Sequence, residues 1–259
     1  MHSNSNAAIS KVPEITLAFW AIKILATTLG ETGGDAVSMS MDLGYLVGTA
    51  IFAVIFFVSV SAQIAATSYK PLLYWTTIIA TTTVGTTLAD FADRSLGLGY
   101  AGGSTLLFLL LMGSFFTWYK FQGNISTGSV TTPGTEMFYW ITIMFSQTLG
   151  TALGDWTADE AGFGYAGSAV LFGGMLVAIV ATYYLTRVSR TLLFWVAFIL
   201  TRPLGAVVGD FLDKPLSKGG LELSRYSASF TLLAAIAALV LISTLRNRQP
   251  VRAELDIEQ

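Results

Sequence analysis

Residues 140–155 read WITIMFSQTLGTALGD. The stretch is apolar or small along nearly all of its length, and it ends on Asp155. A carboxylate at the centre of a membrane helix costs roughly 2.5–3.5 kcal/mol on insertion scales, so an acid in such a setting indicates a use for it. The chain places an aspartate in the same setting four times, and this recurrence sets the fold.

The composition indicates a membrane protein. Of the 259 residues, 53% are hydrophobic and 12% are charged, and the mean hydropathy is +0.64, whereas about 25% of residues are charged in a soluble domain. Four stretches carry no Asp, Glu, Lys or Arg and reach the roughly 20 residues that a helix needs to cross the hydrocarbon core: 43–69, 95–119, 161–186 and 226–245. Four further apolar segments do carry charges: 15–35, 72–91, 137–156 and 192–211. We therefore expect an all-α integral membrane protein with eight transmembrane helices in a single domain, 15–245, between short tails, 1–14 and 246–259.

Several classes of function have no support in the residues. The net charge of −2 gives no basic surface for nucleic acid, and the absence of cysteine excludes disulfides and thiolate metal sites. The one histidine is His2, so imidazole-ligated metals are not expected. The tail 1–14 lacks the features of a cleaved signal peptide. No nucleophile–base pair, phosphate-binding loop or zinc-helix motif is present, so we expect neither an enzyme nor an organic cofactor.

The four charged segments are copies of one pattern. Each contains a tryptophan preceded by another aromatic residue, and the tryptophans are Trp20, Trp75, Trp140 and Trp195. Ten positions later stands a glycine: Gly30, Gly85, Gly150 and Gly205. Fourteen positions later stands a small residue: Gly34, Ala89, Gly154 and Gly209. Fifteen positions later stands an aspartate: Asp35, Asp90, Asp155 and Asp210. Recurrence at fixed offsets establishes four tandem repeats, at about 15–66, 70–119, 135–186 and 190–245.

This pattern resembles a family of bacterial membrane proteins with four tandem repeats of unknown function, each repeat having two transmembrane helices and a tryptophan. The resemblance implies the architecture and leaves the function to the residues. Because each repeat has an even number of spans, all four point the same way, and we expect a pseudo-symmetry axis along the membrane normal. The shared sequence D-F-x-D at 90–93 and 210–213 relates repeats two and four.

Basic residues in the loops predict the orientation. Eight lie on the side of the N-terminus: Lys11, Lys70, Lys120, Arg187, Arg190, Arg246, Arg248 and Arg252. Four lie on the other side: Arg94, Lys214, Lys218 and Arg225. We therefore expect a multi-pass protein of the bacterial inner membrane with both termini cytoplasmic. The tryptophans would then form a belt at the cytoplasmic interface, and the acids, about 22 Å further along their helices, would lie in the outer half of the membrane.

The small residues four apart in each repeat share one helix face. Such pairs let helix backbones approach closely, and we favour this packing role over the alternative that the glycines line a pore. The two can coexist, because helices packed around an axis also bring their acids together.

Other polar residues lie in the same charged segments. Lys23, Thr27 and Glu31 share a helix face, so Lys23 could compensate Glu31. Arg202 lies two turns before Asp210, although a partner on another repeat is as plausible. The remaining candidates for binding a substrate or ion are Thr82 and Gln147, at the same offset as Thr27.

The acids within the predicted spans leave a surplus of three negative charges over Lys23 and Arg202, and three interpretations stay open. These five acids are Glu31, Asp35, Asp90, Asp155 and Asp210. The acids can be structural, each accepting hydrogen bonds at a helix end. They can hold a hard cation such as Mg²⁺, Ca²⁺ or Mn²⁺, with Asp35, Asp90, Asp155 and Asp210 as ligands. They can also load and release protons. Asp93 and Asp213, three residues after a repeat aspartate, would add an acidic vestibule.

The leading hypothesis is a transporter or exporter of a small cation, divalent or proton-coupled, that uses the ring of aspartates. One alternative is a proton-coupled carrier of a small polar or anionic solute held by Lys23 and Arg202. Another is a membrane scaffold or sensor whose acids are structural. The expected partners are the lipid bilayer and a small ion or solute, not nucleic acid, and an oligomer is possible.

Overall fold

The computed structural model describes residues 10–257, and within this range the chain is helical with no strand, as predicted. The part of the predicted N-terminal tail that contains His2 lies outside the described residues. The long helices are α1 (Leu17–Asp35), α2 (Gly44–Ala65), α3 (Pro71–Asp90), α4 (Gly99–Gln122), α5 (Pro133–Asp155), α6 (Gly164–Leu185), α7 (Arg190–Asp213) and α8 (Arg225–Ile257). The last of them continues past residue 245, where we expected a tail to begin.

Local sequence fixes both ends of the odd-numbered helices. Side chains of Thr16, Thr132 and Ser189 accept hydrogen bonds from the free N–H groups of the first turns of α1, α5 and α7. In α3 and α5 a proline occupies the first turn, where no N–H is needed. In the first three repeats the aspartate is the last α-helical residue, and a five-residue π-helical turn follows it: Ala36–Ser40, Phe91–Ser95 and Trp156–Glu160. The fourth repeat continues as α-helix to Asp213, so the offset of the aspartate is kept but the turn is not.

Five of the helices are long and apolar enough to cross a membrane: α2, α4, α6, α7 and α8. The chain therefore has the make-up of a multi-pass membrane protein. Helices α1, α3 and α5 are of similar length, but threonines and charged residues on their buried faces lower their hydropathy.

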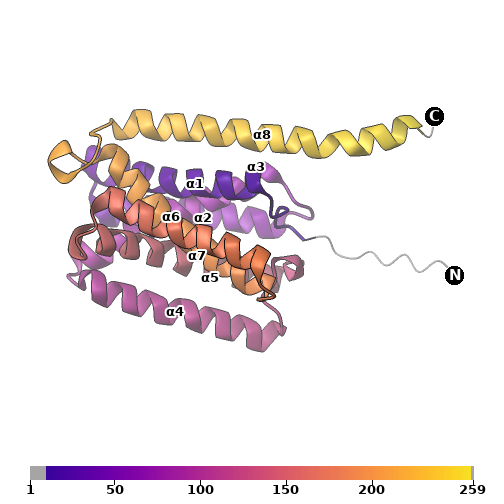
Figure 1. Cartoon of the computed structure of the whole chain (residues 1–259), viewed down its shortest axis with the longest axis horizontal. Coiled ribbons are helices and arrows are strands. Elements are labelled where there is room, and N and C mark those ends of the chain that lie inside the picture. Colours follow the sequence, from indigo (N-terminus) through magenta and orange to yellow (C-terminus); the bar gives the residue numbers. More distant parts are fainter. Residues whose placement is uncertain (1–9, 258–259) are drawn as a thin grey trace.

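The helices form two concentric rings. In the inner ring α1 contacts α3, α3 contacts α5, α5 contacts α7, and α7 closes back on α1. Each outer helix packs against the first helix of the following repeat, so that α2 packs on α3, α4 on α5 and α6 on α7. The last outer helix, α8, completes the circle by packing on α1, beside which it runs in Figure 1. The second helix of each repeat therefore packs mainly on the first helix of the next repeat, and not on the first helix of its own repeat.

Polar and apolar side chains are sorted between the rings. The outer helices expose large apolar side chains such as Val54, Phe57, Val170 and Phe230. In the most apolar 18-residue stretch of α8 only 11% of the residues are buried, whereas 61% are buried in the corresponding stretch of α7. The outer ring is therefore the surface suited to lipid, and the inner ring encloses the polar residues.

The repeat glycines are packing positions. A Cβ atom on Gly30 would lie 2.5 Å from Thr82 Cγ2, and one on Gly85 would lie 3.1 Å from Gln147 Cβ. In the same way, a Cβ atom on Gly150 would overlap the aliphatic part of the Arg202 side chain, and one on Gly205 would overlap the Thr27 side chain. Each glycine thus accommodates a side chain of the next inner helix, which explains the recurring small residues without a pore lined by backbone.

The tryptophans do not form the expected interfacial belt. Trp75, Trp140 and Trp195 are at most 4% exposed, and they pack with the neighbouring aromatic rings in one core cluster at the N-terminal ends of the inner helices. The hydroxyl groups of Tyr74 and Tyr139 are 2.7 Å apart within this cluster. Three of the four tryptophans are therefore core residues, because the closed ring brings the aromatic pairs together and they cover one another, while Trp20 and Phe194 are only partly buried. They close one end of the inner ring.

Candidate functional site

Every fourth residue of each inner helix faces the centre of the ring, which produces four layers of four side chains. The layer next to the aromatic cluster contains Lys23, Ile78, Ile143 and Phe198. The second layer contains Thr27, Thr82, Gln147 and Arg202. The third contains Glu31, Thr86, Thr151 and Ala206. The last contains the repeat aspartates, Asp35, Asp90, Asp155 and Asp210. No member is more than 3% exposed, so this column of polar groups is shielded by the surrounding helices.

Two of the aspartates share a lysine. Lys214 Nζ lies 2.7 Å from Asp35 Oδ2 and 2.9 Å from Asp210 Oδ1, and so joins the first repeat to the fourth. Lys214 follows the last residue of α7. Burial acts to lower the pKa of the Lys214 ammonium, but the Asp210 and Asp35 carboxylates outweigh it and hold that pKa well above its ordinary value. The two carboxylates therefore favour the charged form of Lys214.

The other two aspartates share an arginine. Arg94 Nε lies 3.1 Å from Asp90 Oδ1, and Arg94 Nη2 lies 3.2 Å from Asp155 Oδ2. The same guanidinium donates a hydrogen bond to the hydroxyl of Tyr45. The acid layer is thus divided into two halves, each a pair of aspartates from neighbouring repeats bridged by one base.

Arg94 and Lys214 change the charge balance that we predicted for the interior of the bundle. We placed Arg94 and Lys214 in loops, yet both fold back by one helical turn onto an aspartate four residues earlier. With them, the five acids of the third and fourth layers face four bases, and the surplus is one negative charge, not three. The signal was available, because the shared D-F-x-D of repeats two and four is followed at once by a base.

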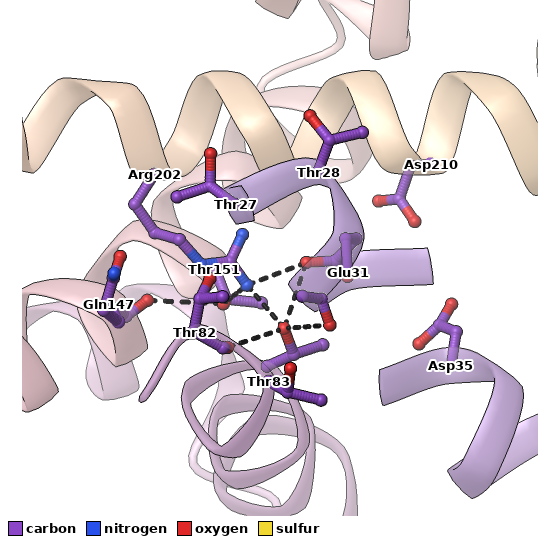
Figure 2. Close-up of polar contacts among 12 residues, drawn as sticks. Thr27, Thr28, Glu31, Asp35, Thr82, Thr83, Gln147, Thr151, Arg202 and Asp210 are labelled. Carbon is purple, nitrogen blue, oxygen red and sulfur yellow. Dashed lines mark hydrogen bonds and ion pairs between the residues drawn. The ribbon is translucent and has the colours of Figure 1, made fainter. Parts of the chain in front are cut away.

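An ion pair between repeats one and four joins the second layer to the third. Arg202 Nη2 lies 2.9 Å from Glu31 Oε2 and also donates hydrogen bonds to the hydroxyl groups of Thr86 and Thr151. All four inner helices meet in this network, and Figure 2 shows the guanidinium extended toward Glu31. The suggested contact of Arg202 with Asp210 is replaced by this partner on another helix.

Lys23 does not pair with Glu31 as we expected. Its ammonium lies 3.4 Å from Gln147 Oε1 and 4.2 Å from the centre of the Phe198 ring. Among the described residues no carboxylate lies within 4.0 Å of it. Glu31 lies in the third layer and pairs with Arg202 of the adjacent second layer, whereas Lys23 lies in the first layer, two layers away.

Several buried polar atoms of the column have no hydrogen-bond partner within the described part of the chain. They are Arg202 Nε and Nη1, Gln147 Nε2, Thr82 Oγ1 and the Oδ1 atoms of Asp35, Asp90 and Asp210, of which the last two are in ion pairs with Arg94 and Lys214. Thr27 differs, since its hydroxyl donates to the carbonyl of Thr201. Unsatisfied donors and acceptors in a buried site are expensive unless water or a ligand completes them.

Three acids of the column lie close enough for one metal ion. Carboxylate oxygens of Glu31, Asp35 and Asp210 all lie within 4.8 Å of one another. In Figure 2, Asp35 and Asp210 face the same space from α1 and α7, with Glu31 beside them. The sequence suggested the four aspartates as ligands, whereas this group replaces Asp90 and Asp155 by Glu31. An all-oxygen donor set fits Mg²⁺, Ca²⁺ or Mn²⁺.

The two vestibule acids have different surroundings. Asp213 accepts a hydrogen bond from Arg225 Nε at 2.8 Å, and the same nitrogen is 3.8 Å from Asp35 Oδ2. Asp93, in the turn after α3, packs against Gly103 with no hydrogen-bond partner for its carboxylate in the described structure. Burial raises the pKa of Asp93 to about 6.

A family model described as Repeat of Unknown Function (DUF347) matches the chain four times, at residues 18–69, 73–124, 138–189 and 193–249. No curated protein and no solved structure shows a significant match. The four matches confirm the tandem repeats read from the sequence and the family that they resemble.

Proposed function

The chain belongs to the DUF347 family of repeats of unknown function, and from the geometry of its buried acids we propose that it is a transporter that carries protons or a small cation across a membrane. The observation that carries the proposal is the acid layer: four buried aspartates, one from each repeat, lie at the end of a polar column that the inner helices shield. Buried ionisable groups of membrane helices typically mark pathways for ions.

We propose that all eight long helices cross the membrane, around a pseudo-symmetry axis that runs through the inner ring. The closed circle of helix contacts supports this arrangement, because each repeat takes an equivalent place in it. The N-terminal end of the described chain and the end of α8 lie on the same side of the bundle in Figure 1. With the excess of basic residues on that side, this favours both termini in the cytoplasm of a bacterium and the acid layer toward the outside.

In the arrangement described, both ends of the polar column are closed. Aromatic rings cover one end, and Arg94 and Lys214 neutralise the acids at the other. A cation that enters from the acid end must displace one of these bases, since it would compete for the same carboxylate oxygens. Passage to the other end requires the aromatic cluster to separate.

A second candidate function is supported by unused donors in the second layer. Within the described part of the chain, Arg202 Nε, Arg202 Nη1 and Gln147 Nε2 have no hydrogen-bond partner, and Lys23 of the adjacent layer has no acid. Together these groups could bind a small anionic solute, with the acid layer supplying coupled protons. Arg202→Lys would then weaken binding of the solute strongly, because the lysine has no planar fork of donors, while cation flux would persist.

We propose no catalytic role and no organic cofactor. A scaffold or sensor with structural acids is the remaining class, and it differs in one measurable respect: no solute moves.

The test is flux through the purified chain in liposomes that contain a dye sensitive to Mn²⁺ or to pH. Asp90→Asn combined with Asp210→Asn, one from each half of the acid layer, is expected to reduce flux by at least about tenfold, the equivalent of 1.4 kcal/mol. Glu160→Gln, at an exposed acid of the same end, is the matched control and keeps the flux. Equal flux in all three proteins, or none in the unaltered chain for any cation or for protons, would contradict the proposal.

A further inference from the structure

Lys214 occupies the place of a cation among three carboxylates. Its Nζ is within 2.9 Å of an oxygen of both Asp35 and Asp210, and these two acids form one compact group with Glu31. None of the three acids is more than 2% exposed. A positively charged group is required here, and the chain supplies it from a residue that follows the end of α7.

Lys214 does not form hydrogen bonds with all the carboxylate oxygens of this group. Asp35 Oδ1 is buried and accepts no hydrogen bond from any described residue, and Asp210 Oδ1 contacts Lys214 without the geometry of a hydrogen bond. Glu31 is shared with Arg202, and Arg225 lies 3.8 Å from Asp35 while it is held by Asp213 at 2.8 Å. Hard divalent cations take six or more oxygen ligands at 2.0–2.6 Å, more than one ammonium can engage.

The opposite half of the acid layer is built differently. Among the described residues, no third carboxylate lies within the same reach of Asp90 and Asp155, and their base is an arginine that also donates to Tyr45. A guanidinium spreads its charge over several directed donors and is not easily replaced by a point charge, whereas an ammonium is itself a point charge on a flexible stem.

We infer that Glu31, Asp35 and Asp210 form a binding site for a hard divalent cation that Lys214 keeps closed, while Asp90, Arg94 and Asp155 form a fixed clamp. This inference rests on the proposed function, because it assigns the transported cation to one half of the acid layer. It makes Lys214 a tethered competitor of the cation: the ion binds when the lysine leaves, and the lysine returns when the ion has gone.

The test is cation binding to the full chain in detergent, with Mn²⁺ as the probe, followed by calorimetry and by the midpoint of thermal unfolding. K214Q is expected to bind Mn²⁺ at least about tenfold more tightly than the unaltered chain, a gain of 1.4 kcal/mol, and to unfold at a higher temperature when Mn²⁺ is present. R94Q removes the base of the other half and is expected to give no gain. K218Q removes an exposed lysine of the same loop and should also give none.

Adding D35N to K214Q is expected to abolish the gain, because it removes a ligand. The inference is overturned if K214Q binds Mn²⁺ no more tightly than the unaltered chain, if R94Q gains as much, or if K214Q with D35N keeps the full gain. K214S is measured in the same way, with the same expectation, if K214Q does not fold. Binding needs no transport, so a gain in binding without any flux contradicts the proposed function alone, and flux without a gain in binding contradicts this inference alone.

Discussion

Arg202 of α7 reaches Glu31 of α1 across the centre of the bundle, with 2.9 Å between Nη2 and Oε2, although the two residues are 171 positions apart in the chain. Neither side chain is more than 3% exposed. The pair links the first repeat to the last and is joined through hydroxyl groups to the other two inner helices. It is therefore the polar centre on which closure of the ring depends.

Separating this pair is expected to destabilise the fold strongly. Glu31→Gln alone leaves a buried guanidinium without its anion, and Arg202→Met alone leaves a buried carboxylate, so each should lower the free energy of unfolding by about 3–5 kcal/mol. The double substitution should cost less than the sum. Unfolding in a denaturing detergent measures this, and additive effects would show that the two residues do not interact.

The glycine contacts predict a graded effect of added volume. Gly150→Ala places a methyl group against the stem of Arg202, and overpacking of this kind costs typically about 1–3 kcal/mol. Gly113→Ala is the control, since a Cβ atom there meets nothing within 4 Å. Comparison of thermal unfolding midpoints should show a large fall only for the first variant. Equal behaviour would contradict the close approach of α5 and α7.

Closure of the outer ring can be tested by a disulfide, because the chain has no cysteine of its own. The hydroxyl oxygens of Thr32 on α1 and Ser229 on α8 are 2.9 Å apart. Thr32→Cys with Ser229→Cys should therefore cross-link within one molecule on mild oxidation. In the control, Thr32→Cys with Ser243→Cys, the second cysteine lies about 21 Å further along α8 and should not react. A cross-link in the control only would contradict the packing of α8 on α1.

We predict that Asp93 makes the stability of the fold depend on pH. Its pKa is raised from 3.8 to about 6, chiefly by burial, so the folded chain binds the proton more tightly than the unfolded chain does. The contribution of this group is most favourable below pH 3.8, falls as the pH rises toward 6, and is unfavourable above it. Asp93→Asn should raise the unfolding midpoint at pH 7 and reduce its fall between pH 4 and 6. An unchanged profile would contradict this assignment.

The repeat pattern was sufficient to predict the eight helices and part of the polar column, namely the aspartates and several of the residues on the same helix faces. A tryptophan and an aspartate fifteen positions apart mark one helix face, and the same face contains Gln147 and Arg202. Periodicity identifies such a face because positions four apart lie above one another along a helix.

Which helix packs against which could not be predicted from the pattern. Each second helix packs on the next repeat, so α8 meets α1, and the short connections say nothing of this choice. The ion pairs were missed for a related reason. Arg94 and Lys214 were counted as loop residues. The local sequence places each base four residues after an aspartate, but it does not show the second partners, Asp155 and Asp35, which lie on other repeats. Both observations depend on the closed ring, which is a tertiary property.

The central claim is that cations reach the buried aspartates of the inner ring. The most direct measurement is the transient charge movement in proteoliposomes on a solid-supported membrane after a step in Mn²⁺ concentration or in pH. The unaltered chain should give a transient current that Asp35→Asn combined with Asp210→Asn removes and Glu160→Gln preserves. A current of the same size in the double variant, or none in the unaltered chain for either step, would contradict the account.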